Sequence, residues 1–445
     1  MVVMKFGGTS VRNADYMDKA LDIAADQLND GVLLVSSAMS KITDSLIAIT
    51  NAAERGDEEQ VNILLNDIRT RHLETASEFL TGVNLDECIS VLNNRLSRLS
   101  ALVKGLTLLR ECSDRSRDAL MAFGELLSTT LLYYRAVERG MDAVFLDSRQ
   151  MIITDDNFTE AYPRFEITND KIRDAVEMKG NRIFIAQGFI GSTEDGATTT
   201  LGRGGSDFTA TIFGAALGVS EVQIWTDVNG IMTTDPRLVK EARTVPEISY
   251  DEAAELAYFG AKVVHPSTIR PAVLDRIPVS VKNTADPGGI CTTISEKAVG
   301  EGLRAIAGKK NITLLNITSS KMLNAYGFLS AIFKVFEDHR TSVDLVATSE
   351  VSVSMTIENT ESINMITSDL NSLGEVKVET GKSIISLVGL NLWRDSAFTA
   401  QVFSTLKDIP IRMISLGSSD INLSLVVPQD MMEETIIKLH GEFFS

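Results

Sequence analysis

Six short apolar runs constrain the fold of the first 295 residues more than any other feature of the sequence. They cover residues 2–6, 32–36, 143–146, 182–186, 222–225 and 278–281. Continuous apolar runs of this length are typical of strands covered on both faces. Because stretches with helical spacing separate the runs, the pattern predicts an α/β domain with a mainly parallel sheet. Residues 44–140 are expected to be almost continuously helical, with breaks near 81–82 and near Gly105.

A domain boundary is predicted at 284–302, where Pro287, Gly288 and Gly289 precede a polar, charged stretch. Beyond it the sequence repeats itself. A shift of 70 positions aligns Phe328 with Phe398 without gaps, and brings Ser354 onto Ser424. This internal similarity predicts two copies of one small α+β unit.

The repeat also predicts the elements of each copy. The first copy is expected to run βαββαβ, with strands near 311–318, 342–348, 351–357 and 375–379 and helices near 327–339 and 362–373. The second is expected to have strands near 384–389, 411–416 and 421–427 and helices near 396–408 and 429–443, without a fourth strand. We expect the strand-like run 303–307 to complete the second sheet, so that the first unit is inserted in the second. The predicted domains are therefore 1–295, then 309–381 for the first small module, and 302–308 with 382–445 for the second.

The charge balance excludes some classes of partner. The chain has 42 Lys and Arg against 60 Asp and Glu, a formal charge of −18. Such a surface repels nucleic acid and anionic membranes, so neither is expected as a partner. If the substrates are anions, a few basic residues must create a local positive field.

Cysteine and histidine usage indicates no metal site and a reducing compartment. Cys88, Cys112 and Cys291 lie far apart, and none of the four histidines has metal-ligand spacing. No apolar run is long enough to span a membrane, and no signal peptide is expected at the N-terminus. These features favour a cytoplasmic protein.

Two glycine-rich turns carry the first chemical signals. Lys5-Phe6-Gly7-Gly8 follows a buried strand, where glycines let backbone N–H groups approach an oxyanion and the lysine adds charge. Taken alone, this turn is equally consistent with a tight strand-to-helix connection. The second turn, 200–210, holds Gly202, Arg203, Gly204, Gly205 and Asp207 and opens into an apolar helix. A helix start suits phosphate, and an arginine can hold a carboxylate with two hydrogen bonds. The simpler role for Asp207 is helix capping, at or near the N-cap.

Two further segments follow strands and end in polar turns. Residues 224–237 leave a strand through Thr226 and Asp227, at the strand end where ligands of α/β sheets bind. Residues 259–266 place Lys262 beside a Gly-Ala turn. By itself Lys262 is as readily a solvated surface lysine as a ligand-binding one.

In this order and across the whole chain, the four segments resemble those of the amino-acid kinase superfamily, and specifically the aspartokinases. The paired C-terminal units are similar to the nested ACT modules of that family. The resemblance implies a three-layer kinase domain with a mainly parallel sheet, followed by two βαββαβ modules. It implies transfer of the γ-phosphoryl group of ATP to the side-chain carboxylate of L-aspartate, giving 4-phospho-L-aspartate in the synthesis of lysine, threonine and methionine.

The resemblance also assigns roles to residues. Lys5, Asp207 and Lys262 are implied to be catalytic, with Asp207 orienting the lysines. The implied nucleotide site is Lys5, Gly7, Gly8, Thr226, Asp227, Met232, Asp235, Arg237 and Lys262, with Gly7 and Gly8 as backbone donors. The implied aspartate site is Ser37, Thr43, Glu125, Phe189, Arg203 and Ser206, with Arg203 on the α-carboxylate and Glu125 on the ammonium. Mg²⁺ is expected to bind mainly through the nucleotide phosphates, with no protein metal site.

Four positions depart from the family pattern. Lys41 stands where a glycine is usual and Asp44 where an asparagine is usual, so close backbone approach at position 41 is in question. Met232 replaces a tyrosine that often packs on adenine, although a thioether can still do so. Ala325 replaces a serine of the regulatory module.

The first small module resembles that of lysine-inhibited aspartokinases. Asp344 and Glu350 are implied to bind the two ammonium groups of lysine, and threonine is the alternative effector. The implied effector residues are Met322, Gly327, Phe328, Leu329, Ser342, Val343, Asp344, Ser349 and Glu350. The alternative for Asp344 and Glu350 is that they are solvated charges at strand ends. ACT-type sheets commonly pair between subunits, so a homodimer or a dimer of dimers is expected.

Two other functions compete with this interpretation. The first is a superfamily kinase for glutamate, acetylglutamate, UMP or carbamate, against which the Phe123-Gly124-Glu125 segment and the double module argue. The second is an amino-acid sensor without catalytic activity, against which Lys5, Arg203, Asp207 and Lys262 argue.

Overall fold

The computed structural model describes residues 1–176, 182–260, 264–296, 300–323, 326–417 and 419–445. The chain divides into two compact units. The first comprises Met1–Ile231 and Val264–Ala298, and the second comprises Met232–Val263 and Val299–Ser445. Residues 232–263, which the sequence analysis assigns to the kinase domain, therefore cluster with the C-terminal modules.

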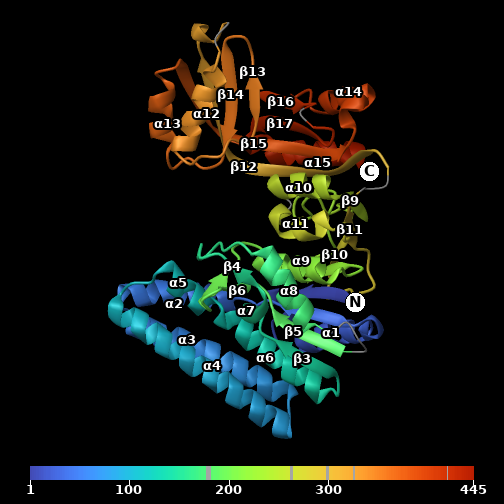
Figure 1. The fold of residues 1–445 in the computed structure, drawn as a ribbon. Coiled ribbons are helices and arrows are strands. Elements are labelled where there is room, and N and C mark those ends of the chain that lie inside the picture. The colour runs from blue at the N-terminus through green and yellow to red at the C-terminus, as the bar shows by residue number, and fades with distance from the viewer. Residues whose placement is uncertain (177–181, 261–263, 297–299, 324–325, 418) are drawn as a thin grey trace. The chain divides into compact units, whose positions relative to one another are not determined.

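A mainly parallel sheet forms the centre of the first unit, as predicted (Figure 1). Its strands run in the order β3-β5-β2-β1-β8-β10-β11, and all neighbours pair in parallel except β10 with β11. The central strands β1 and β2 are apolar and buried, which is why they appear in the sequence as continuous apolar runs. The strands are β1 (Val2–Phe6), β2 (Val32–Ser36), β3 (Asp142–Leu146), β5 (Arg182–Gln187), β8 (Val222–Thr226), β10 (Val279–Asn283) and β11 (Thr292–Ser295).

A smaller sheet and several helices complete this unit. The small sheet has the order β4-β6-β7, with β4 (Ile153–Thr154), β6 (Ile190–Thr193) and β7 (Thr198–Thr200). The connecting helices are α1 (Ala14–Ala25), α7 (Ser148–Met151), α8 (Phe165–Ala175), α9 (Gly205–Leu217) and α11 (Pro266–Leu274), with the short 3-10 helices η1 (Gly8–Val11) and η2 (Leu28–Asp30).

The predicted helical stretch forms a layer whose helices share one core with the sheet, and α3 and α4 lie side by side within it (Figure 1). The predicted break at 81–82 is confirmed, because α3 ends at Phe79 and α4 begins at Gly82. The predicted break at Gly105 is wrong. One helical glycine costs only about 1 kcal/mol, less than burial of the neighbouring Val103 and Leu106 contributes. The helices are α2 (Ile42–Arg55), α3 (Glu58–Phe79), α4 (Gly82–Leu109), α5 (Asp114–Met121) and α6 (Phe123–Glu138).

One antiparallel sheet runs through both copies of the C-terminal repeat. Its order is β13-β14-β12-β15-β17-β16. The strands are β12 (Gly302–Thr318), β13 (Val346–Thr348), β14 (Ser352–Ile357), β15 (Glu375–Leu390), β16 (Met413–Leu416) and β17 (Asn422–Pro428). The helices are α12 (Phe328–Asp338), α13 (Ile363–Leu370), α14 (Ser396–Thr405) and α15 (Met432–Phe443), with 3-10 turns η3 (Ser320–Met322), η4 (Leu392–Arg394) and η5 (Gln429–Met431).

The long strands β12 and β15 join the two copies, where the sequence predicts separate strands and two sheets. The run 303–307 pairs with 386–389 of β15, so its predicted pairing with the second copy is confirmed. Ile306 lies in the core of that copy with Leu387 and Leu425. The register of β12 against β15 shifts between Lys309 and Leu314, which marks the junction between the copies.

Residues 232–260 add a small element to the second unit. It contains β9 (Glu247–Ser249) and α10 (Tyr250–Tyr258). Ser249 and Glu252 form a capping box at the start of α10, because each side chain accepts a hydrogen bond from the other residue's backbone N–H. This fixes where α10 begins and therefore where Tyr258, its last residue, lies.

Lys41, which stands where the family pattern has a glycine, has a backbone conformation that is typical of glycine. It precedes α2 with φ 68°, in the left-handed region. A residue with a Cβ is strained there by roughly 1–2 kcal/mol. We predict that Lys41→Gly raises the free energy of unfolding by about 1 kcal/mol, measured by urea denaturation.

The matched control is Lys104→Gly. Lys104 is an exposed lysine inside α4, where glycine should lower the free energy of unfolding by about 1 kcal/mol. Destabilisation by both substitutions would contradict the assignment of strain to position 41.

Candidate active site

An ion pair between Lys5 and Asp207 connects the end of β1 to the first turn of α9. Lys5 Nζ lies 2.7 Å from Asp207 Oδ1, and each side chain is 12% exposed. Asp207 is the third residue of α9, and the N-cap is Gly204, which has no side chain to cap with. The capping role considered for Asp207 is therefore wrong, since its carboxylate faces the lysine.

Gly7 and Gly8, which follow Lys5, have roles that differ from the implied one. Gly7 N–H donates to the carbonyl of Trp225 at 3.1 Å, so it has no free proton for a phosphate. The expectation of Gly7 as a backbone donor is therefore wrong in this conformation. A Cβ at Gly7 would lie 3.4 Å from Lys5 Nζ, and one at Gly8 would lie 2.9 Å from the Ala38 carbonyl. Gly7 therefore leaves room beside the ammonium, and Gly8 allows close approach to the backbone of residues 38–40.

The second glycine turn places a helix start beside this ion pair. Gly204 has φ 71°, and a Cβ on Gly205 would lie 2.7 Å from the Phe189 ring. Phe189 itself has φ 70° and donates its N–H to Thr209 Oγ1 at 3.0 Å. Gly205 N–H donates to Gly202 O and Phe208 N–H donates to Gly204 O, whereas the N–H groups of Ser206 and Asp207 between them have no backbone acceptor among the described residues. Such free groups suit an anion.

One pocket of about 330 Å³ brings the predicted residues together, and we call it the Lys5 pocket. Every residue predicted for aspartate lines it, together with two of the three predicted catalytic residues. The implied aspartate site omits Gly202, Gly204 and Gly205, although the sequence analysis places them in one glycine-rich turn with Arg203. Its lining is Lys5, Ser37, Thr43, Glu125, Phe189, Gly202, Arg203, Gly204, Gly205, Ser206 and Asp207.

Glu125 places a buried carboxyl group in the Lys5 pocket. It is 4% exposed and accepts a hydrogen bond from Ala38 N–H at 3.1 Å. Burial raises its pKa to about 8, although the Ala38 N–H acts in the opposite direction. Among the described residues no cation forms an ion pair with it. A carboxyl group of this kind can receive an ammonium group from a ligand.

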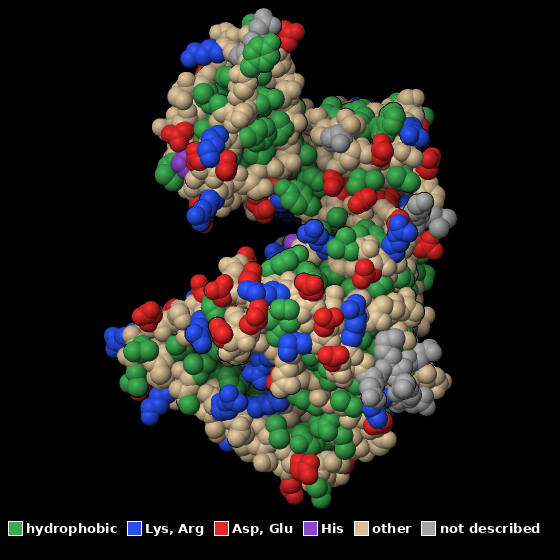
Figure 2. Space-filling view, in the orientation of Figure 1, with side chains coloured by type: hydrophobic (Ala, Val, Ile, Leu, Met, Phe, Trp, Pro, Cys, Tyr) green, Lys and Arg blue, Asp and Glu red, His purple; other side chains and the backbone are tan. Residues whose placement is uncertain are grey.

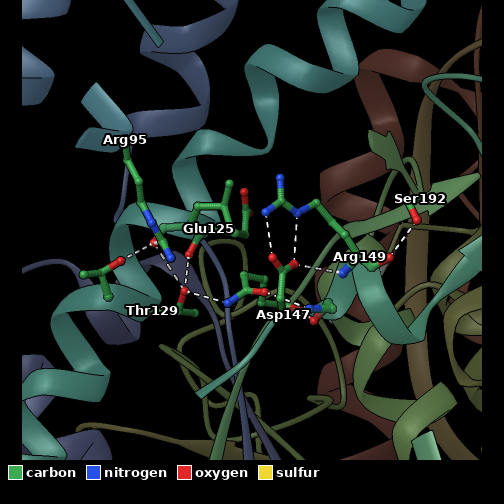
Figure 3. Close-up of polar contacts among 10 residues, drawn as sticks. Arg95, Glu125, Thr129, Asp147, Arg149 and Ser192 are labelled. Carbon is green, nitrogen blue, oxygen red and sulfur yellow. Dashed lines mark hydrogen bonds and ion pairs between the residues drawn. The ribbon is translucent and has the colours of Figure 1, made fainter. Parts of the chain in front are cut away.

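Polar contacts around Glu125 fix the start of α6 (Figure 3). Thr129 Oγ1 donates to the Glu125 carbonyl at 2.7 Å and accepts from Gln187 Nε2 at 3.0 Å. Arg95 donates to the Leu126 carbonyl, and burial lowers the pKa of this arginine to about 10. Asp147 pairs with Arg149 at 2.6 Å beside them. Because Thr129 bonds the Glu125 carbonyl and Arg95 bonds the Leu126 carbonyl, the backbone at the start of α6 has a defined position.

Arg203 supplies the opposite charge on the pocket wall. Its side chain is exposed, and among the described residues no carboxylate forms an ion pair with it. Acidic and basic side chains are interspersed over the face drawn in Figure 2. An arginine left without a carboxylate, in a chain of charge −18, is therefore available to a ligand.

The predicted nucleotide residues fall in both units. Thr226 and Asp227 follow β8 in the first unit, where Thr226 Oγ1 donates to Asp227 Oδ1 at 3.3 Å. Met232 forms a bridge with Thr244 in the second unit. Asp235 there pairs with Arg237 at 2.6 Å, and the hydrogen bond from Arg237 lowers the pKa of Asp235. Lys262 lies outside the described residues.

The predicted effector residues lie in three segments of the first module. Gly327 is the N-cap of α12 with φ 81°, and Met322 ends η3. Ser349 bonds Ser352 in the turn that also carries the exposed Glu350. Ser342, Val343 and Asp344 precede β13, and Phe328 and Leu329 begin α12. Asp344 is not a solvated charge, because its side chain is 3% exposed and lies 3.0 Å from Lys309 Nζ. Ala325 lies outside the described residues.

Two general properties of the described residues bear on function. None of their helices has the length and apolar character that a bilayer crossing requires. Among the same residues, no three His, Cys, Asp or Glu side chains are grouped as a metal ion would need.

Known proteins match the chain over its full length. The amino acid kinase family matches residues 1–283, and an ACT domain matches residues 385–443. The lysine-sensitive aspartokinase 3 of Escherichia coli is 38% identical, across all of this chain and 99% of that protein. The chloroplastic aspartokinase 2 of Arabidopsis thaliana is also 38% identical, across all of this chain and 84% of that protein.

Solved structures match the fold as well. The E. coli aspartokinase III complex with aspartate and ADP, in the R-state, gives a TM-score of 0.85 at 37% identity, with both chains fully covered. The T-state complex of that enzyme with lysine and aspartate gives 0.80 at 37% identity, again with full coverage of both chains. The aspartate kinase of Clostridium acetobutylicum gives 0.83 at 27% identity, also with full coverage of both chains.

The raised pKa of Glu125 predicts a pH-dependent stability. The folded state holds this proton up to about pH 8, whereas an unfolded glutamate releases it near its ordinary value of 4.5. The stabilisation is therefore complete at low pH and is lost as the pH rises through 8. Glu125→Gln should become more stable relative to the unmodified chain between pH 5 and 8, by at most about 1.4 kcal/mol per pH unit.

The measurement is urea denaturation of both chains across that range. Glu78→Gln, on the exposed face of α3, is the control and should track the unmodified chain. A stability difference for Glu125→Gln that stays constant with pH would show that Glu125 is ionised when folded.

Proposed function

Since this chain belongs to the amino acid kinase family and, within it, to the aspartokinases, we propose how its own residues phosphorylate aspartate. The enzyme transfers the γ-phosphoryl group of ATP to the side-chain carboxylate of L-aspartate and forms 4-phospho-L-aspartate. This is the first step toward lysine, threonine and methionine.

The observation that carries the proposal is the charge pattern of the Lys5 pocket. Glu125 offers a carboxyl group that would carry the negative charge beside the substrate ammonium, and Arg203 offers a cation for the α-carboxylate. Lys5 and the start of α9 form a further positive region in the same pocket. An amino acid with a second carboxylate has complementary charges. Ser37, Thr43, Phe189 and Ser206 complete the proposed aspartate site.

The chemistry needs positioning more than proton transfer. A carboxylate with a pKa near 4 is ionised at neutral pH, so the nucleophile requires no general base. The difficulty is repulsion between two anions, which fixed positive groups offset. Lys5, held by Asp207, would stabilise the transferring phosphoryl group, and Lys262 is proposed to act with it. The free N–H groups of Ser206 and Asp207 add partial positive charge on the same side.

The proposed nucleotide site consists of Lys5, Gly8, Thr226, Asp227, Met232, Asp235, Arg237 and Lys262. Gly7 would contribute by leaving space next to Lys5 rather than by donating a hydrogen bond. Mg²⁺, when bound, neutralises charge on the phosphates. It is proposed to bind chiefly through the nucleotide, as Mg²⁺ commonly does.

We also propose that lysine inhibits the enzyme through the first ACT module. The similarity to a lysine-sensitive relative and to its lysine complex supports this effector over threonine. The proposed site keeps the nine predicted residues from Met322 to Glu350. A homodimer, or a dimer of dimers, is proposed through the ACT modules. The cytoplasmic location inferred from the cysteines stays a prediction.

The function is tested by ADP release with aspartate against glutamate, glutamate being the substrate of a rival superfamily kinase. Turnover with aspartate should exceed turnover with glutamate by roughly 100-fold or more, because an extra methylene misplaces the carboxylate. Lys5→Ala should lower kcat by roughly 100-fold or more while the KM for aspartate changes by less than about threefold.

Lys19→Ala, an exposed lysine on α1, is the control and should leave both constants unchanged. Turnover with glutamate but not aspartate would assign the pocket to another carboxylate kinase, and no turnover with either would favour a sensor. Near-normal kcat in Lys5→Ala would remove Lys5 from the chemistry.

The regulatory proposal predicts inhibition by lysine and little response to threonine. Asp344→Ala should raise the lysine concentration at half inhibition by roughly tenfold or more, since a charged partner is lost. Asp338→Ala, on the exposed end of α12, is the control. Inhibition by threonine alone would reverse the effector assignment, and insensitivity to both amino acids would overturn the regulatory proposal.

A further inference from the structure

The carboxylate of Asp344 already has two partners within its own unit. Asp344 Oδ1 accepts from Lys309 Nζ at 3.0 Å and from the Tyr258 hydroxyl at 2.5 Å. Lys309 Nζ also lies 3.0 Å from Glu358 Oε2 and 4.5 Å from the centre of the Tyr258 ring. These four side chains come from β12, α10 and the first module and form one polar cluster, in which Asp344 and Lys309 are largely buried while Tyr258 and Glu358 are exposed.

The second oxygen of the same carboxylate has no such partners. Asp344 Oδ2 is buried and makes no hydrogen bond with any of the described residues. A buried oxygen without a donor is unfavourable. Oδ1 therefore has its hydrogen-bond donors within the chain, whereas Oδ2 can accept a hydrogen bond from an added donor.

Tyr258 ties this cluster to a segment with a predicted catalytic residue. It is the last residue of α10, followed by Phe259, which is 2% exposed. A Cβ on the next residue, Gly260, would lie 2.7 Å from the Gly308 carbonyl, so the segment packs closely against β12. Lys262 comes two residues later in the sequence.

We propose that Tyr258 is a positioning residue for the kinase reaction and that its hydrogen bond to Asp344 holds it in place. Lys309 is an internal cation with which the effector competes for Asp344. This inference rests on the proposed lysine regulation and deepens it. Lys309 has on its side chain the same ammonium group as free lysine. An effector ammonium that reaches Asp344 meets a like charge from Lys309 and a competing donor from Tyr258.

The electrostatics are consistent with this competition. Burial, followed by the Asp344 carboxylate, raises the pKa of Tyr258, so its hydroxyl stays protonated and donates. Burial alone would lower the pKa of Lys309, but Asp344 and Glu358 raise it overall, so the amine stays charged. A second ammonium on Asp344 is a stronger donor than a phenol. It would therefore weaken the bond that holds the 258–260 segment.

The proposal predicts different effects for the substitutions Lys309→Met and Tyr258→Phe. Lys309→Met removes the internal cation, so lysine should bind at least fivefold more tightly and inhibit at correspondingly lower concentration. Tyr258→Phe keeps the ring but removes the hydrogen bond to Asp344. It should lower kcat/KM for ATP at least fivefold without effector, and should reduce the further inhibition by saturating lysine to less than half of the normal effect.

Lys310→Met is the matched control, because Lys310 is the next residue on β12 and pairs with Glu433 instead. It should leave lysine binding and basal activity unchanged. Lysine binding is measured by titration calorimetry on the full chain, and activity by ADP release. The affinity for lysine and the effect of bound lysine on activity are thus measured separately. Thermal unfolding of each variant establishes that it is folded under the assay conditions.

The outcomes distinguish the inference from the regulatory proposal beneath it. Lysine binding to the unmodified chain, with Lys309→Met unchanged or weaker, would overturn the competing role of Lys309 alone. Normal activity and full inhibition in Tyr258→Phe would overturn the positioning role. Absence of lysine binding to the unmodified chain would overturn both the inference and the regulatory proposal, while leaving the aspartate kinase assignment intact.

Discussion

The ion pair of Lys5 with Asp207 is the contact on which the arrangement of the catalytic unit depends. It joins residues 202 positions apart, one at the end of the central strand and one in the first turn of a helix. Pairing partly buried charges rarely adds much stability, because desolvation offsets the attraction. Its value here is geometric. The carboxylate holds a flexible lysine at one place, and the lysine ammonium then faces the pocket that Arg203 and Glu125 also line.

The same constraint explains why so few cations serve an enzyme with two anionic substrates. The chain has a net charge of −18, so its overall field opposes both ATP and aspartate. The pocket overcomes this locally with Lys5, the start of α9 and Arg203, which pairs with no carboxylate in the part of the chain that the structure describes. Glu125 does not cancel this positive charge while the pocket is empty, because burial keeps it protonated up to about pH 8. An ammonium group bound beside it would favour its charged form.

Sequence reasoning succeeded where side-chain pattern and backbone structure agree. The apolar strands follow from burial, the break after α3 from the Thr81-Gly82 step, and the pairing of 303–307 from the repeat, whose second copy lacks a strand. It failed where hydrogen bonding continues through polar residues. Lys309 and Lys310 look like a loop between two strands, but β12 runs through them, and Gly308 and Lys309 pair with Ile385 and Ile384 of β15. The raised pKa of Glu125 and the bond from Tyr258 to Asp344 depend on contacts between distant residues, which one sequence does not reveal.

The fusion of the two modules into one sheet gives Lys309 its particular place. Two separate sheets would each end near residue 309, and a lysine there would be solvated. In the continuous strand, the register shift after Lys309 marks the junction between the copies, and Asp344 of the first copy meets Lys309 there. Tyr258 reaches the same carboxylate from the segment before Lys262. A small change in the charge around Asp344 therefore acts on the 258–260 segment. This segment has few alternative positions, because close packing of Gly260 against Gly308 limits where it can move.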